Sequence, residues 1–150
     1  MFEVTKEFNF EAGHCLDQHP GKCKNLHGHN YKVFVTMQSK KLNNMDMVMD
    51  FYDLNTFAKP LFDKFDHAFM YNANAQDPFE KEIVQVCAKN NRKLIGLETR
   101  LTAERMAEYF YKTLNELLFE EKNVPVIISK VTVYETPTSF ATYYEEEDKT

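Results

Sequence analysis

The stretch Cys23-Lys-Asn-Leu-His27-Gly28-His29-Asn30-Tyr31 places a thiol, a glycine and two imidazoles close together in the chain. From Tyr31 to Met37, apolar side chains recur at every second position, which is typical of a β-strand. We therefore predict a strand from about residue 29 to residue 38. In a strand, residues two apart share a face, so His27 and His29 should point to the same side, while Gly28 leaves the other side free of bulk.

The two histidines are candidate ligands of a metal ion, because imidazole binds zinc well. The alternative is that the pair forms part of an ordinary polar strand face. A catalytic zinc ion usually has three protein ligands and one open position. His14 is the best third candidate, since it ends the first predicted strand and a neighbouring strand could bring it close. His19 precedes Pro20 in a loop, which is more typical of a surface histidine.

Cys23 is a candidate catalytic thiol. It lies between Lys22 and Lys24, and adjacent positive charge favours the thiolate. The alternative is a fourth ligand in a closed structural zinc site. Structural sites that contain thiolates usually use two or more cysteines, which favours the catalytic interpretation. Cys15 and Cys87 are more typical of buried core residues.

Composition limits the class of protein. The chain has 150 residues, 43% hydrophobic and 27% charged, which predicts one globular domain over residues 1–150. The net charge is −5 and no basic stripe is visible, which argues against a nucleic-acid partner. Three cysteines without a Cys-x-x-Cys pair favour a reducing compartment. With no apolar signal core and no membrane-length apolar run, we expect a cytoplasmic protein without a membrane partner.

The periodicity of the remaining chain predicts the fold class. Phe2 to His14 forms a first strand, and residues 126–135 and 139–144 form a hairpin of two more. Two main amphipathic helices follow Asp53 and Thr102, and a shorter helix is expected from Asp77 to about Lys89. Residues 93–97 form a short apolar connection. We predict an α+β fold in which a four-stranded antiparallel sheet carries two main helices on one face, in the order ββααββ.

Two further groups are weaker candidates for the site. Asp66 precedes His67, and a carboxylate can fix the tautomer of a histidine that relays a proton. The alternative is a histidine that interacts with the dipole at the end of a helix. Glu135 ends an apolar strand, where it is either exposed or placed to accept hydrogen bonds from an N–H beside an NH₂ group.

Together, these elements resemble the 6-pyruvoyl-tetrahydropterin synthase family, and most closely its bacterial 6-carboxy-tetrahydropterin synthase branch. The resemblance covers nearly the whole chain. It rests on the following segments: Phe10-Glu-Ala-Gly-His14, Cys23-x-x-x-His27-Gly-His29-Asn-Tyr31, Asp50-Phe-Tyr-Asp-Leu54, Asp66-His67, Thr102-Ala-Glu104 and Val133-Tyr-Glu135-Thr-Pro-Thr138.

The resemblance implies a role for each candidate residue. His14, His27 and His29 would hold zinc. Cys23 would accept a proton, and Asp66 and His67 would complete a relay from a neighbouring subunit. Glu135 would anchor the pterin ring and assist proton transfer, and Thr102 would line the pterin pocket. The implied fold is the tunnelling fold, whose sheets join into a barrel in trimers that pair as homohexamers.

The implied reaction is the zinc-dependent conversion of 7,8-dihydroneopterin triphosphate to 6-carboxy-5,6,7,8-tetrahydropterin, with release of acetaldehyde and triphosphate, in queuosine biosynthesis. The three-residue spacer between Cys23 and His27 resembles this branch. Leu101 stands where the family often has proline. The alternatives are 6-pyruvoyl-tetrahydropterin synthase, which eliminates triphosphate without side-chain cleavage, and a non-catalytic zinc-dependent pterin-binding protein.

Overall fold

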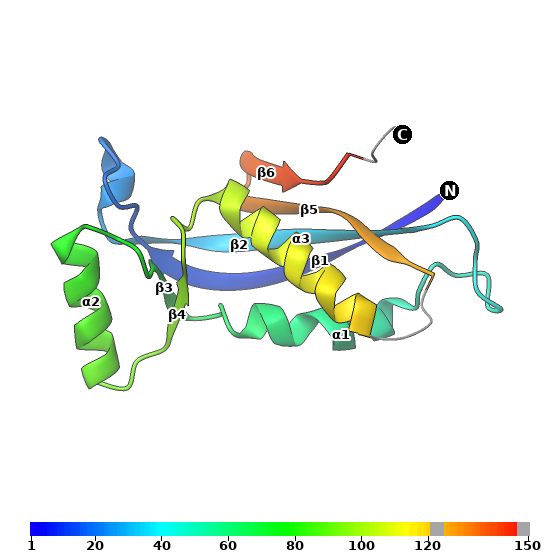
Figure 1. Ribbon diagram of the computed structural model, residues 1–150, viewed down its shortest axis with the longest axis horizontal. Coiled ribbons are helices and arrows are strands. Elements are labelled where there is room, and N and C mark those ends of the chain that lie inside the picture. The colour runs from blue at the N-terminus through cyan, green and yellow to red at the C-terminus, as the bar shows by residue number, and fades with distance from the viewer. Residues whose placement is uncertain (121–124, 147–150) are drawn as a thin grey trace.

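The computed structural model describes residues 1–120 and 125–146 of the chain. Within them lie six strands, three α-helices and one turn of 3-10 helix, η1 (Figure 1). In chain order these are β1 (Phe2–His14), η1 (Lys22–Lys24), β2 (His27–Ser39), α1 (Phe51–Asp63), β3 (Ala68–Asn72), α2 (Pro78–Lys89), β4 (Leu94–Leu97), α3 (Ala103–Glu120), β5 (Ile127–Thr136) and β6 (Ser139–Tyr143).

All six strands belong to one sheet in the order β4-β3-β1-β2-β5-β6. The pairs β1–β2, β2–β5 and β5–β6 are antiparallel, whereas β1–β3 and β3–β4 are parallel. The prediction of an α+β fold is thus confirmed, and the four predicted strands are present. The prediction of a four-stranded antiparallel sheet was wrong in detail, because β3 and β4 add a parallel edge.

The two added strands are short and give little periodic signal. Residues 68–70 of β3 are all buried, so the strand lacks the alternation of a sheet with one wet face. β4 has only four residues and contains Gly96. Apolar runs of this length cannot be distinguished from a buried connection by periodicity alone.

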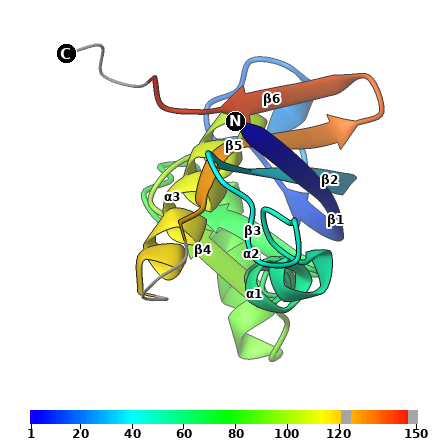
Figure 2. The same ribbon diagram turned by 90° about the vertical axis from the view of Figure 1, so that its right-hand side faces the viewer.

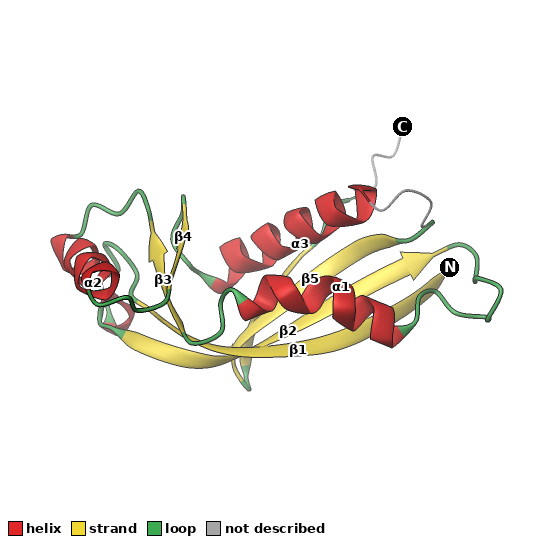
Figure 3. Ribbon diagram, turned by 90° about the horizontal axis from the view of Figure 1, so that it is seen from below, coloured by secondary structure: helices red, strands yellow, loops and turns green. Residues whose placement is uncertain are grey.

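Helices α1 and α3 lie on the same face of the long strands, as predicted (Figure 3). Helix α2 lies apart from them, beside β3 and β4 at one end of the molecule. It begins as predicted after Asp77, whose carboxylate accepts the amide N–H of Phe79. In the first turn of this helix, the Oε1 of Glu80 accepts the amide N–H of Asn72, 2.8 Å away on β3.

The core fills the space between this sheet face and the two helices. Every second side chain is buried there from Phe8 to Ala12 of β1 and from Tyr31 to Met37 of β2, and an aromatic cluster joins the layers. The ring of Phe10 lies 5.0 Å from that of Tyr31 in the sheet and 6.1 Å from that of Phe110 on α3. The strands also fan and curl across the sheet (Figure 2), and the pairing of β2 with β5 shifts register after Thr36, as at a β-bulge.

None of the described helices is long and apolar enough to cross a membrane.

Candidate active site

The pairing of β1 with β2 brings three histidines together. His14 lies directly opposite His27, and His29 lies opposite Ala12, one inward-facing position further along. Cross-strand neighbours on one face of an antiparallel pair are close enough to interact. One ligand atom from each of the three imidazoles lies within 4.8 Å of the others, and the Nε2 atoms of His14 and His27 are 3.1 Å apart. The structure thus brings together all three predicted metal ligands.

Backbone carbonyls orient two of these rings. The Nδ1 of His14 lies 2.9 Å from the carbonyl oxygen of Leu101, and the Nδ1 of His27 lies 2.7 Å from that of Asn25. A carbonyl only accepts hydrogen bonds, so each Nδ1 carries a proton and donates it. In the neutral rings both Nε2 atoms then present lone pairs to each other at short range. This repulsion is relieved by a cation between them, so the donor set fits a metal ion.

Burial keeps two of these imidazoles neutral. Burial, together with the neighbouring His27 and His29, lowers the pKa of His14 to about 4, against the opposing effect of the Leu101 carbonyl. Burial and His27 lower the pKa of His29 as well. Neutral imidazole is the form that binds metal ions, so these ligands are available at neutral pH without loss of a proton.

Glu135 lies beside the histidine cluster at the end of β5. Its Oε2 is 4.0 Å from the Nε2 of His29. Burial raises the pKa of Glu135, Glu104 raises it further, and His27 lowers it. A cavity of about 540 Å³ is lined by both Glu135 and His29, together with other residues of β2, the end of β5 and the turn that follows it. The structure therefore places this carboxylate next to the histidines.

Thr102 stands at the start of α3, next to the residue that orients His14. Its Oγ1 accepts the amide N–H of Arg105 at 3.3 Å, and its carbonyl accepts that of Met106. The predicted capping role is therefore present. The same helix start brings Glu104 into the electrostatic surroundings of Glu135.

Cys23 lies in η1 and is half-buried. It is not a member of the histidine cluster within the part of the chain that the structure describes. Its carbonyl accepts the amide N–H of Leu16 at 2.8 Å, which closes the loop between β1 and β2. The sulfur is thus carried on a short, folded loop, four residues before the first histidine of β2.

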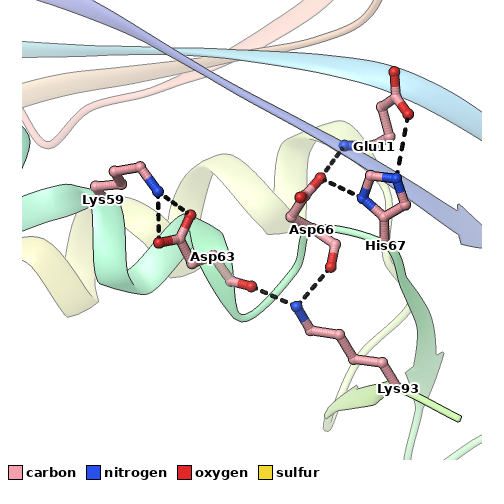
Figure 4. A network of polar contacts seen from close by, with 6 residues as sticks. All are labelled: Glu11, Lys59, Asp63, Asp66, His67 and Lys93. Carbon is pink, nitrogen blue, oxygen red and sulfur yellow. Dashed lines mark hydrogen bonds and ion pairs between the residues drawn. The ribbon is translucent and has the colours of Figure 1, made fainter.

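Asp66 and His67 lie in the turn before β3, on the side of β1 that faces away from β2 (Figure 4). They gather around Glu11, which is exposed between the buried side chains of Phe10 and Ala12. The Nδ1 of His67 is 3.0 Å from the Oδ1 of Asp66, and its Nε2 is 3.7 Å from Glu11. The structure therefore does not bring Asp66 and His67 to the histidine cluster of the same chain.

The turn that carries Asp66 and His67 is held by hydrogen bonds between side chains and backbone groups. The Oδ1 of Asp66 accepts the amide N–H of Glu11, and the Nζ of Lys93 donates to the carbonyls of Asp63 and Asp66, both at 2.6 Å (Figure 4). The φ of His67 is 58°, in the left-handed region that few non-glycine residues adopt. The exposed imidazole, with a side-chain exposure of 74%, is thus held in a defined place on the surface.

Comparison with known proteins identifies the family. A family model described as 6-pyruvoyl tetrahydropterin synthase matches residues 3–146. The chain belongs to the 6-pyruvoyl tetrahydropterin synthase family. The family predicted from the sequence is thereby confirmed.

Two curated relatives of this 6-pyruvoyl tetrahydropterin synthase family member are named 6-carboxy-5,6,7,8-tetrahydropterin synthase. The protein of Haemophilus influenzae is 40% identical over 149 residues, which cover 97% of this chain and 100% of the relative. That of Aquifex aeolicus is 37% identical over 162 residues, covering 97% and 99%. The chain is therefore an enzyme.

Solved structures share the fold of this family member. A crystal structure of an uncharacterized protein from Wolinella succinogenes aligns with a TM-score of 0.80 at 23% identity, covering 97% of this chain and 98% of that one. The 6-pyruvoyl tetrahydropterin synthase of Plasmodium vivax aligns with a TM-score of 0.73 at 21% identity, with the same coverage. At these identities the likeness concerns the fold alone.

Several residues around the site were not singled out from the sequence. The carbonyls of Asn25 and Leu101 act through the backbone, so their residue types carry no signal. The buried hydroxyl of Tyr31 has no hydrogen-bond partner among the described residues, and its ring lies 5.4 Å from that of His29. Alternation along β2 could have predicted that Tyr31 shares the histidine face.

Proposed function

We propose that the protein is a 6-carboxy-5,6,7,8-tetrahydropterin synthase, a zinc-dependent lyase that acts on 7,8-dihydroneopterin triphosphate in the cytoplasm. The observation that carries this proposal is the three-histidine cluster with Glu135 beside it, in a chain 40% identical to a curated relative of that name. The product would serve the synthesis of queuosine.

The histidine cluster fits a catalytic rather than a closed structural metal site. His14, His27 and His29 would hold the ion through three nitrogen ligands, and this ligand set would leave a fourth position for substrate or water. When bound, zinc supplies Lewis acidity that makes the C–H and O–H bonds of the substrate side chain easier to deprotonate. The Nδ1 bonds of His14 and His27 to backbone carbonyls hold these rings in the tautomer that a metal requires.

The protein groups would divide the remaining work. Cys23, flanked by Lys22 and Lys24, would accept the proton from the side chain. Asp66 would orient His67, and His67 would relay the proton. Because this pair lies on the other side of β1, we propose that it comes from a neighbouring subunit of a homo-oligomer, a hexamer built as a dimer of trimers.

Glu135 would anchor the pterin. Its carboxylate can accept two hydrogen bonds from the ring N–H and the adjacent NH₂ group, and Thr102 at the start of α3 would line the same pocket. Burial disfavours the charged form of Glu135. A donor edge that pairs with the carboxylate would compensate for that cost, which favours a pterin over a ligand without such an edge.

The overall reaction balances without an external oxidant. The bond from the side chain to the triphosphate oxygen breaks, the side chain splits into a C6 carboxylate and acetaldehyde, and one water supplies the extra oxygen. The two electrons that the side chain loses reduce the dihydropterin ring to the tetrahydro level.

Product analysis with 7,8-dihydroneopterin triphosphate tests the proposal. We expect equal amounts of acetaldehyde and triphosphate. Triphosphate without acetaldehyde would assign the chain to the 6-pyruvoyl reaction instead, and pterin binding without turnover would refute the enzymatic assignment to this substrate. Cys23→Ala should lose turnover and keep its zinc, whereas Cys87→Ala, a half-buried cysteine on α2, should keep both.

A further inference from the structure

One loop links the parts of the proposed site. Residues 15–26 connect β1, which ends in His14, to β2, which begins with His27, and this loop carries Cys23. A thiol on a loop is useful for proton transfer only if the loop is held in place, because small misplacements of a reacting group cost large factors in rate. The question is therefore what holds this loop.

Asp17 anchors the loop on one side. The residue is 5% exposed, and both oxygens of its carboxylate are used. Oδ2 accepts the amide N–H of Gln76 at 3.1 Å, and Oδ1 accepts that of Asp77 at 3.0 Å. The loop is thereby tied to the start of α2. A buried carboxylate with two backbone donors is a strong and directional anchor.

Arg100 anchors the loop on the other side. Its Nε donates to the backbone carbonyl of Asp17 at 2.8 Å, and its Nη2 donates to the Oε1 of Gln18 at 3.2 Å. Arg100 directly precedes Leu101, whose carbonyl orients the ring of His14. One short segment thus holds both the loop with the thiol and a ligand of the histidine cluster.

We propose that Asp17 and Arg100 are positioning residues that hold the 15–26 loop, and with it Cys23, in a fixed place relative to the three histidines. Arg100 donates hydrogen bonds to residues 17 and 18. The adjacent Leu16 donates its amide N–H to the carbonyl of Cys23, so that holding residues 17 and 18 also restrains Cys23. The inference rests on the proposed function, because it assigns Cys23 the proton transfer. It concerns the rate of that step and not the binding of metal or pterin.

The test uses Arg100→Ala in the zinc-loaded, full-length protein. Arg100 is an exposed residue, so its removal should leave the fold intact. We expect amide exchange in the 15–26 segment to rise by at least about fivefold, because the variant loses both hydrogen bonds from Arg100 to the loop. Alkylation of Cys23 by iodoacetamide, followed by peptide mass spectrometry, should accelerate. The value of kcat should fall about 10- to 100-fold while KM stays unchanged.

Arg92→Ala is the matched control. Arg92 is an exposed arginine in the turn between α2 and β4, and its side chain makes no hydrogen bond among the described residues. All readouts should stay at wild-type values in this variant. Asp17→Asn provides a second, nearly isosteric variant that turns one acceptor oxygen into a donor facing an amide N–H, so it should shift the same readouts in the same direction.

Two results would overturn the inference. One is an Arg100→Ala protein with wild-type exchange and alkylation in the loop, and the other is a loosened loop with an unchanged kcat. A wild-type protein without turnover would instead refute the proposed function, while exchange and alkylation would still decide whether Arg100 holds the loop.

Discussion

At the scale of single residues, the position of His14 explains most of the chemistry that the site can support. The imidazole is 1% exposed, yet it is polar and needs partners at both nitrogens. The Nδ1 of His14 donates a hydrogen bond to the carbonyl of Leu101, and its Nε2 faces the Nε2 of His27. A side chain that is buried, neutral and left with a free lone pair is suited to bind a cation and poorly suited to carry a proton.

This environment predicts a pH dependence in the metal-free protein. The pKa of His14 is about 4 in the fold and about 6.5 when the chain is unfolded, so protons bind the unfolded state preferentially. The free energy of unfolding should therefore fall as the pH drops from about 6.5 to about 4, by about 3 kcal/mol from this residue, and should not depend on His14 above that window.

Urea denaturation between pH 4 and 7.5 in the presence of a chelator measures this effect. His14→Gln should flatten the curve in the acidic range, whereas His19→Gln, a change in the loop outside the cluster, should retain the wild-type slope. A His14→Gln protein with an unchanged slope would contradict the assignment.

At the scale of secondary-structure elements, the strands at the parallel edge depend on one close contact. A Cβ atom built on Gly96 of β4 would lie 2.5 Å from the Cζ of Tyr71, its partner on β3. The backbone of Gly96 does not have a positive φ, so the ring, not the backbone conformation, requires glycine. The tyrosine ring thus covers the space that a side chain would fill.

Gly96→Ala should therefore destabilise the protein by about 1 kcal/mol, because the ring of Tyr71 must swing aside. In a Tyr71→Ala background the same substitution should be neutral or slightly stabilising, since alanine suits a strand better than glycine. A double-mutant cycle by urea denaturation measures the coupling. Equal costs in both backgrounds would show that the contact does not limit residue 96.

A buried carboxylate, that of Glu80, links helix α2 to β3, and burial disfavours its charged form. Glu80 is 1% exposed, and its Oε2 has no hydrogen-bond partner among the described residues. Burial raises its pKa, and the nearby Asp17 and Asp77 raise it further against the Asn72 amide. The native state thus holds the Glu80 proton more tightly than the unfolded state, and wild-type stability should decline as the pH rises through this raised pKa.

Glu80→Gln keeps an oxygen for the Asn72 amide and cannot ionise. Its melting temperature relative to wild type should therefore be higher at pH 8 than at pH 4, where the carboxyl group is protonated in both the folded and the unfolded state. Glu82→Gln, an exposed neighbour on the same helix, should show no such trend. Thermal unfolding at several pH values decides this, and a parallel course of the Glu80→Gln and wild-type curves would contradict it.

The elements that could be predicted from the sequence are those with a long periodic pattern. The apolar periodicity is clear in β1, β2, α1 and α3. The periodicity of β2 also predicted that His27 and His29 share one face of the strand. β2 begins at His27, two residues earlier than predicted, because Gly28 and the histidines do not continue the apolar alternation. β3 and β4 were missed because neither is long enough to show a period.

The candidate site could be predicted only in part for a related reason. That His14 would meet His27 depends on the register of two strands, which is not visible in either strand alone. Cys23 and Glu135 were candidates from the residues alone, and the resemblance to a known family supplied the specific roles proposed for them. The anchoring of the loop by Asp17 and Arg100 joins residues 83 positions apart and has no local signal.

At the scale of the whole molecule, the faces of the sheet separate the candidate groups. The histidine cluster lies on the face that carries α1 and α3, whereas Asp66 and His67 gather around Glu11, whose side chain points the other way. Neighbouring side chains of a strand point to opposite faces, so Glu11 and the two residues around it do not face the three histidines of the same chain. If both sets act on one substrate, the second set must come from another copy, and this predicts complementation between inactive variants.

Cys23→Ala and His67→Ala should each be inactive alone, but hybrids assembled from equal amounts should recover up to about a quarter of wild-type turnover, since a site then pairs an intact face from each chain at random. A mixture of Cys23→Ala with His14→Gln is the control and should recover nothing, because both defects lie in the same half of the site. Turnover is measured after co-refolding, and assembly is checked by light scattering. Assembled hybrids without recovery would mean that Asp66 and His67 do not complete a site in a neighbouring subunit.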